Sequence, residues 1–261
     1  MDLLIGTLTL RPYVFGFVAA FLVAGALDLG ARRTLLFAAW VGPLAWLAEF
    51  ASTRIGIPFG LYHYTGTTHG QELFLADVPL IDCLSFTFLA YASLCLARAA
   101  LSGRRVPAPV LALFAGVLMM LLDVVMDPVA VRGDRWFLGR IFYYPDGGIY
   151  FGVPLSNFAG WIIVGTLGVG GFFYSGGWRE PTRAFGLSAP SSALPDGFGA
   201  RYWPGIALYY AVFGFNLAVT GWIGEWVLVM LGASMHGATA AVLWTLSQRP
   251  AGRLGLEKQQ A

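Results

Sequence analysis

Seven long apolar runs dominate the chain of 261 residues. They cover residues 13–30, 34–52, 79–97, 107–128, 149–175, 204–221 and 223–246. An α-helix needs ~20 residues to cross a hydrocarbon core of ~30 Å, so each run is long enough for about one crossing. The mean hydropathy of +0.69 and the charged fraction of only 11% agree with this reading. The sequence therefore predicts an all-α, polytopic membrane helix bundle of about seven transmembrane helices. We expect residues 1–248 to form one transmembrane domain and residues 249–261 a cytoplasmic tail.

Basic residues are unequally divided between the two sides of this predicted bundle. With the N-terminus outside, the cytoplasmic segments hold Arg32, Arg33, Arg98, Arg104, Arg105, Arg179, Arg183, Arg201, Arg249, Arg253 and Lys258. The opposite side holds Arg11, Arg54, Arg132, Arg135 and Arg140. By the positive-inside rule this division predicts an N-out, C-in orientation. We expect a multi-pass protein of the prokaryotic cell (inner) membrane.

Three smaller features limit the function classes. The net charge of +2 lacks the basic excess that nucleic-acid binding requires, so no nucleic-acid partner is expected. Cys83 and Cys95 lie on one predicted helix at a spacing of roughly 18 Å, too far apart for a disulfide with each other. The stretch "GTLGVGG" at 165–171 is expected to let its helix approach neighbouring helices closely.

Acidic residues gather in the predicted non-cytoplasmic half of the membrane. They are Glu49, Asp77, Asp82, Asp123, Asp127 and Glu225. An ionised Asp at the bilayer centre costs about 2.5–3.5 kcal/mol on insertion scales, so this concentration predicts a shared polar cavity. The alternative for most of them is a polar contact that locks two helices together. Asp77 is expected to cap a helix before Pro79, and Glu225 would be a turn residue if the last two spans form a hairpin.

The local sequence around each acid suggests whether its carboxyl is protonated or ionised. Asp123 and Asp127 lie four residues apart on one helix face. Pro128 disfavours helical geometry at the preceding residue, so the helix is expected to end at Asp127. The helix dipole, the neighbouring carboxyl and the apolar surroundings then all favour a protonated Asp127 or Asp123. Glu49, near the end of its own helix, is expected to share this bias. Asp82, near a predicted helix start, is expected to stay ionised. At the cytoplasmic end, Asp28 is expected to pair with Arg32 or Arg33.

An apolar cavity with a buried acid and many aromatic residues suits proton-driven chemistry on an isoprenoid. Protonation of a trisubstituted alkene gives a tertiary carbocation, which aromatic faces stabilise by cation–π attraction. Water or an internal double bond can then quench the cation, giving hydration or cyclisation. Neither reaction needs a cofactor, and the sequence indicates no metal cluster.

Four stretches carry a family resemblance. They are "PFGLYHYT", "VPLIDCLSFTFLAY", "LDVVMDPVA" and "YYPDGGIYFGVPLSNFAGW". Together they resemble the carotenoid-biosynthesis integral membrane family, which includes the CruF-type carotenoid 1,2-hydratases; the likeness is strongest over residues 40–165. The resemblance implies addition of water to the carbon-1,2 double bond of an acyclic carotenoid ψ-end group. Lycopene, γ-carotene or a bisanhydrobacterioruberin-like carotenoid would supply that end group.

In this interpretation Asp127, assisted by Asp123, protonates carbon 2. Asp82 or Glu49 deprotonates the attacking water. The residues expected to bind substrate are Tyr62, Tyr64, Tyr150, Asn157, Trp161 and Glu225. The polyene is expected to lie among spans two to five. The expected partners are thus an apolar carotenoid, water and the lipid bilayer.

Two other classes remain open at this stage. A UbiA-like, magnesium-dependent intramembrane prenyltransferase would use "DVVMD" as its DxxxD motif, although the sequence has one such motif where those enzymes have a pair. A non-catalytic lipid or pigment carrier could use the same carboxylates. A retinal Schiff base is excluded, because the only lysine is Lys258 in the tail.

Overall fold

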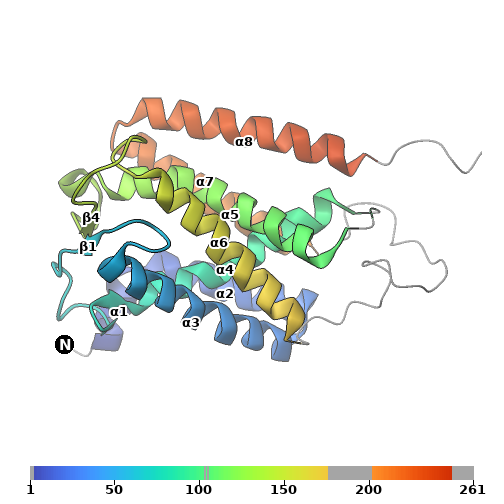
Figure 1. Ribbon diagram of the computed structural model, residues 1–261, viewed down its shortest axis with the longest axis horizontal. Coiled ribbons are helices and arrows are strands. Elements are labelled where there is room, and N and C mark those ends of the chain that lie inside the picture. The colour runs from blue at the N-terminus through green and yellow to red at the C-terminus, as the bar shows by residue number, and fades with distance from the viewer. Residues whose placement is uncertain (1–2, 103, 105, 176–201, 249–261) are drawn as a thin grey trace, which may run out of the picture.

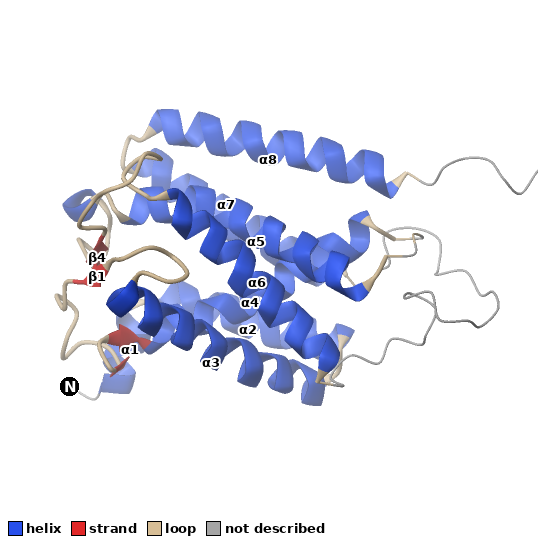
Figure 2. Cartoon of the chain, in the orientation of Figure 1, coloured by secondary structure: helices blue, strands red, loops and turns tan. Residues whose placement is uncertain are grey.

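A computed structural model describes residues 3–102, 104, 106–175 and 202–248. Within these residues the helices are α1 (Leu3–Leu10), α2 (Pro12–Asp28), α3 (Ala31–Ile55), α4 (Leu80–Ala100), α5 (Ala108–Ala130), α6 (Leu155–Tyr174), α7 (Trp203–Trp222) and α8 (Trp226–Ser247). The strands are β1 (His63–Tyr64), β2 (Phe74–Leu75), β3 (Val78–Pro79) and β4 (Phe142–Tyr143). Figure 2 shows that helices make up most of the fold.

The described helices confirm a bundle of about seven spans. Six of them, α3 to α8, are long and apolar enough to cross a membrane, and α1 with α2 forms a further broken span that is bent by 88°. The break falls where Pro12 begins α2, because proline has no N–H to continue the helix before it. The apolar runs did not predict α1, and Arg11 was expected only as a basic residue on the non-cytoplasmic side.

Helix α4 lies at the centre of the bundle, and 78% of its apolar stretch is buried, compared with 22% for α8. Figure 1 shows α8 along one edge of the bundle and α3 along the opposite edge. Large apolar side chains on α8, such as Trp226 and Trp244, face outward. Carboxyls and amides such as Asp123 and Asn157 lie inside. This arrangement suits a lipid bilayer, in which polar groups must find partners within the protein.

Among the described residues, the two long connectors lie at the same end of the bundle (Figure 1). They join α3 to α4 and α5 to α6, and β1 pairs antiparallel with β4 across them. In extended chain, alternate side chains point to the same face. The pairing therefore places Tyr62 and Tyr64, with Phe142 and Tyr144, over the bundle interior.

Helices α5 and α6 approach each other closely at two glycines. A side chain at Gly116 would collide with the backbone of α6, and one at Gly165 would collide with Gly116 itself. The expected role of the "GTLGVGG" stretch is confirmed at this contact. The close approach brings the carboxyls of α5 within reach of the amide of α6.

Helix α5 does not end at Asp127, and that prediction was wrong. It continues to Ala130 with Pro128 inside it, and the Val131 N–H donates to the Asp127 carbonyl oxygen at 3.0 Å. Proline in the last turn removes only one helical hydrogen bond, so the helix tolerates it there. Asp127 thus keeps helical geometry and shares a face with Asp123.

Two acids outside this face also have other partners than expected. Asp28 pairs with Arg98 at 2.7 Å and not with Arg32 or Arg33. Asp77 is exposed and lies 3.7 Å from Arg54, while Pro79 takes the N-cap position of α4 without a side-chain cap. The connector 176–201 and the tail 249–261, which hold much of the basic charge behind the predicted orientation, lie outside the described residues.

Candidate functional site

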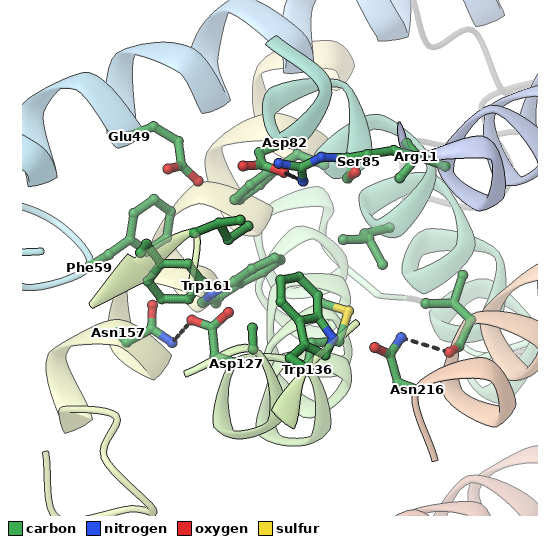
Figure 3. Close-up of a pocket in the computed structure, with 18 of the residues that line it drawn as sticks. Arg11, Glu49, Phe59, Asp82, Ser85, Asp127, Trp136, Asn157, Trp161 and Asn216 are labelled. Atoms are coloured by element: carbon green, nitrogen blue, oxygen red, sulfur yellow. Dashed lines mark hydrogen bonds and ion pairs between the residues drawn. The ribbon is translucent and has the colours of Figure 1, made fainter. Parts of the chain in front are cut away.

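One pocket lies beneath the two paired connectors and has an interior volume of about 160 Å³. Its polar lining comprises Arg11, Glu49, Tyr62, Tyr64, Asp82, Ser85, Asp127, Tyr144, Asn157 and Asn216. In the view of Figure 3, Arg11 and Asp82 lie on one side of Trp161, and Asp127 and Asn157 lie on the other. The shared polar cavity predicted from the acidic residues is therefore present for Glu49, Asp82 and Asp127.

Asp123 and Asp127 meet at a single amide. Asn157 Nδ2 donates to Asp123 Oδ2 at 2.6 Å and to Asp127 Oδ2 at 2.8 Å. Asp123 is fully buried behind the pocket wall, whereas Asp127 lines the pocket. Among the described residues, no ion pair joins either carboxyl to Lys or Arg. Two carboxyls this close, without a cation, are most stable when they share a proton.

Glu49 accepts hydrogen bonds from two phenols of the connector between α3 and α4. The Tyr64 hydroxyl donates to Glu49 Oε2 at 2.7 Å, and the Tyr62 hydroxyl donates to the same oxygen. Burial and the neighbouring Glu49 raise the pKa of Tyr62 and the pKa of Tyr64 well above the ordinary value. Both phenols therefore remain protonated donors across the physiological pH range.

Asp82 belongs to a buried ion-pair cluster. Asp82 lies in the first turn of α4, near the helix start that the sequence predicted. Its Oδ1 lies 2.5 Å from Arg11 Nη1. Arg11 Nη2 lies 2.8 Å from Glu72 Oε1. The side chains of Arg11 and Glu72 are 2% and 0% exposed, whereas that of Asp82 is 23% exposed. Asp82 is thus the member of this cluster that presents most surface to the pocket.

The rest of the lining is aromatic and aliphatic. Trp161 stacks on Phe86 with ring centroids 4.5 Å apart, and Phe59 lies 6.1 Å from Trp161. Phe17 of α2 and Phe215 of α7 continue this apolar surface. The pocket therefore combines carboxyls with a large apolar wall, an arrangement that suits a hydrocarbon substrate with one reactive end.

Comparison with known proteins assigns the chain to a family. Residues 9–239 match the family described as carotenoid biosynthesis protein. The chain belongs to this family. It is also similar to the bisanhydrobacterioruberin hydratase of Haloarcula japonica, with 31% identity over 229 residues, which are 86% of this chain and 68% of that relative. No solved structure matches.

Two residues expected to bind substrate lie outside the pocket of this carotenoid biosynthesis protein. Tyr150 contacts the rings of Phe151 and Phe158 at 5.1 and 5.4 Å and is absent from the lining. Glu225 lies at the turn between α7 and α8, where Arg135 Nη1 approaches it at 2.5 Å. Both were grouped with the site because they are near it in membrane depth, which does not determine which way a side chain points.

Three residues that pair with or hydrogen-bond to the carboxyls of the site were missed. Arg11 was expected only as a basic residue on the non-cytoplasmic side, and Glu72 was not singled out at all. Tyr144, whose hydroxyl donates to Asp127 Oδ2 at 3.4 Å, was passed over in favour of Tyr150. The alternation of side chains along "IFYYP" gave a usable signal for Tyr144, whereas no local signal marks Arg11 as buried.

Proposed function

We propose that this carotenoid biosynthesis protein is a carotenoid 1,2-hydratase, which adds water to the terminal double bond of an acyclic ψ-end group. Lycopene, γ-carotene and bisanhydrobacterioruberin-like carotenoids carry such an end group. The observation that supports the proposal most directly is the carboxyl pair of Asp123 and Asp127, held by one amide at an apolar pocket. A relative of 31% identity named as a hydratase supports the same reaction.

Asp127 is the proposed acid. It lines the pocket, and Asp123 lies behind it as the partner that shares the proton. Transfer of this proton to carbon 2 breaks the carbon-1,2 π bond and leaves a tertiary cation at carbon 1. The amide of Asn157 then stabilises the carboxylate that remains, because it donates to both carboxyls.

The aromatic lining is the proposed stabiliser of the cation. The stacked rings of Trp161 and Phe86 present π surface inside the pocket. Cation–π attraction of this kind contributes about 0.5–2 kcal/mol per favourable ring. Tyr62 and Tyr64 add further rings, while their hydroxyls remain directed at Glu49.

Asp82 is the proposed base, with Glu49 as the second carboxyl near the water. Water attacks carbon 1, and the proton that it loses passes to Asp82, so that the product is a tertiary alcohol. The balance is one alkene and one water in, one alcohol out. A proton carried through pocket water from Asp82 to the aspartate pair restores the starting state.

The polyene has to extend beyond the pocket. The interior volume of the pocket is only about 160 Å³, so it can take an end group but not the length of a polyene. The apolar wall includes Phe17 of α2 and Phe215 of α7. The chain is therefore proposed to lie against α2 and α7 as well, and not only among predicted spans two to five.

Expression in a lycopene-producing host tests the function, with pigments separated by chromatography and identified by mass. Hydration gives a product heavier by one water per end group, and a chelator leaves the yield unchanged. A product with the same mass as the substrate would indicate cyclisation and contradict hydration. Unaltered pigment bound to the protein would indicate a carrier.

The prenyltransferase alternative is less well supported by the geometry of the DxxxD motif. Asn157 Nδ2 lies between the two carboxyls, at the place where a bridging magnesium ion would sit. A pigment lengthened by an isoprenoid unit, formed only with magnesium present, would nevertheless replace the hydratase proposal by this alternative.

A further inference from the structure

We propose that Arg11 is a positioning residue that keeps Asp82 ionised and directed into the pocket, and that Glu72 holds Arg11 in place for this task. The inference rests on the proposed hydratase reaction, in which Asp82 accepts the proton of water. It concerns a segment, the corner between α1 and α2, that carries none of the residues assigned to the reaction so far.

Contacts at this corner are specific and buried. Arg11 uses Nη1 for Asp82 at 2.5 Å and Nη2 for Glu72 at 2.8 Å. The partners are distant in sequence, 71 and 61 residues away. Since the guanidinium is planar, bonds from two of its nitrogens fix both its position and its orientation. Glu72 therefore decides where Arg11 can place the Asp82 carboxylate.

Helix α1 secures the other side of this cluster. The Thr7 hydroxyl accepts a hydrogen bond from the Leu73 N–H at 3.0 Å, directly beside Glu72. Thr7 is itself buried. The 88° bend between α1 and α2 turns Arg11 toward the connector and α4. The short helix α1 thus contributes to the site because it fixes the position of Arg11, the residue that follows its last turn.

Charge balance shows what Arg11 does for the reaction. Arg11 is the only Lys or Arg in the described pocket lining, which also contains Glu49, Asp82 and Asp127. In an apolar site a carboxylate is stable mainly when a cation or several donors compensate it. Arg11 supplies that compensation to Asp82 and leaves the pair of Asp123 and Asp127 without a cation. Arg11 therefore favours the ionised form of Asp82, the proposed base, without favouring the ionised form of Asp127, the proposed acid.

Other titratable groups also face Asp82. They are Tyr13 on α2, Glu49 on α3, Tyr64 and Glu72 on the connector, Cys83 on α4 and Asp127 on α5, together with Arg11. Within this set only Arg11 is a cation. Removal of Arg11 thus leaves carboxyls, phenols and a thiol around Asp82, and ionisation of Asp82 then requires a higher pH.

The test compares Arg11→Met with Arg11→Lys in membranes that contain a lycopene-type substrate. Activity is measured from pH 5 to pH 9 as hydrated product per folded protein. We expect Arg11→Met to move the acid limb of the profile upward by about one pH unit or more, because an adjacent cation typically favours a carboxylate by about 1–3 units. Arg11→Lys is expected to restore most of the profile. Glu72→Gln is expected to lower activity less than Arg11→Met.

A double variant separates action through Asp82 from a general effect on folding. If Arg11 acts through Asp82, Arg11→Met adds little to the loss caused by Asp82→Asn. Independent losses that multiply would overturn the inference, and so would an acid limb that stays in place in Arg11→Met. Asp28→Asn is the matched control, because it breaks a buried ion pair outside the pocket. Its acid limb is expected to remain unchanged.

The two proposals fail in different ways. If the unmodified protein forms no hydrated product, the hydratase function fails, whatever the variants do. If it forms that product and Arg11→Met keeps the full pH profile, only the role of Arg11 fails.

Discussion

Helix α4 carries one buried ion pair near each of its ends, and the two pairs differ in their surroundings. Asp82, in the first turn, pairs with Arg11 at 2.5 Å, and Arg98, in the last turn, pairs with Asp28 at 2.7 Å. Each links α4 to the N-terminal part of the chain. The Asp82 side chain is 23% exposed, whereas that of Asp28 is 0% exposed. Only the first pair lines the pocket.

The enclosed pair is covered by neighbours from several elements. Tyr91 donates to Asp28 Oδ2 at 3.4 Å, and Arg98 stacks on the ring of Tyr202 at 4.1 Å. At the pocket end, by contrast, the lining holds three carboxyls and one guanidinium, and only Asp82 of the three pairs with it. A covered ion pair joins helices, whereas an excess of carboxyls beside open space leaves groups able to exchange protons. Both pairs consist of one Asp and one Arg, so the difference between them arises from the residues around each pair.

The largest effect is expected for Asp127→Asn, which removes the proposed acid at the pocket end. General acid catalysis contributes about 10²–10⁴-fold, so hydrated product should fall by at least about 100-fold. Pigment mass spectrometry, normalised to folded protein from size-exclusion chromatography, measures this. Activity near that of the unmodified protein would show that Asp127 is not the acid.

The reverse outcome is expected for Asp28→Asn at the covered end. Loss of one partner of a buried ion pair typically costs about 3–5 kcal/mol. Thermal unfolding in detergent should therefore shift to a lower temperature. Activity per folded molecule should be retained, and a loss as large as that of Asp127→Asn would contradict the division between the two ends.

A smaller effect is expected for Trp161→Leu in the aromatic wall. Loss of a cation–π contribution of about 0.5–2 kcal/mol slows the reaction by about 2–30-fold. The rate of product formation in membranes measures it. Trp244→Leu is the control, because Trp244 lies on the outer surface of α8. Equal slowing in both variants would remove the special role of Trp161.

The smallest effect is expected for Glu225→Gln. Glu225 lies outside the pocket and pairs with Arg132 and Arg135. Glu225 is 17% exposed and Arg135 55% exposed, and exposed ion pairs contribute about 0–1 kcal/mol. Stability should therefore fall modestly, and hydration should stay within about twofold. A tenfold loss of product in the same pigment assay would return Glu225 to the site.

Sequence patterns were reliable where the physics is local. Hydropathy located the spans, since a helix in lipid must be apolar over its whole length. The four-residue spacing placed Asp123 and Asp127 on one face, and the glycines of the "GTLGVGG" stretch predicted a close helix contact. Pro128 was misjudged, because the local preference for ending a helix is weaker than the contacts that hold α5 in place.

Only the tertiary structure decided which polar groups meet. Asn157 bridges the aspartates, and Arg11 reaches Asp82 across 71 residues of sequence. Tyr150 and Glu225 were placed at the site on membrane depth alone, and both point elsewhere. Membrane depth follows from hydropathy, a property of each segment. The direction of a side chain depends on how helices rotate and pack against one another, and that depends on the whole chain.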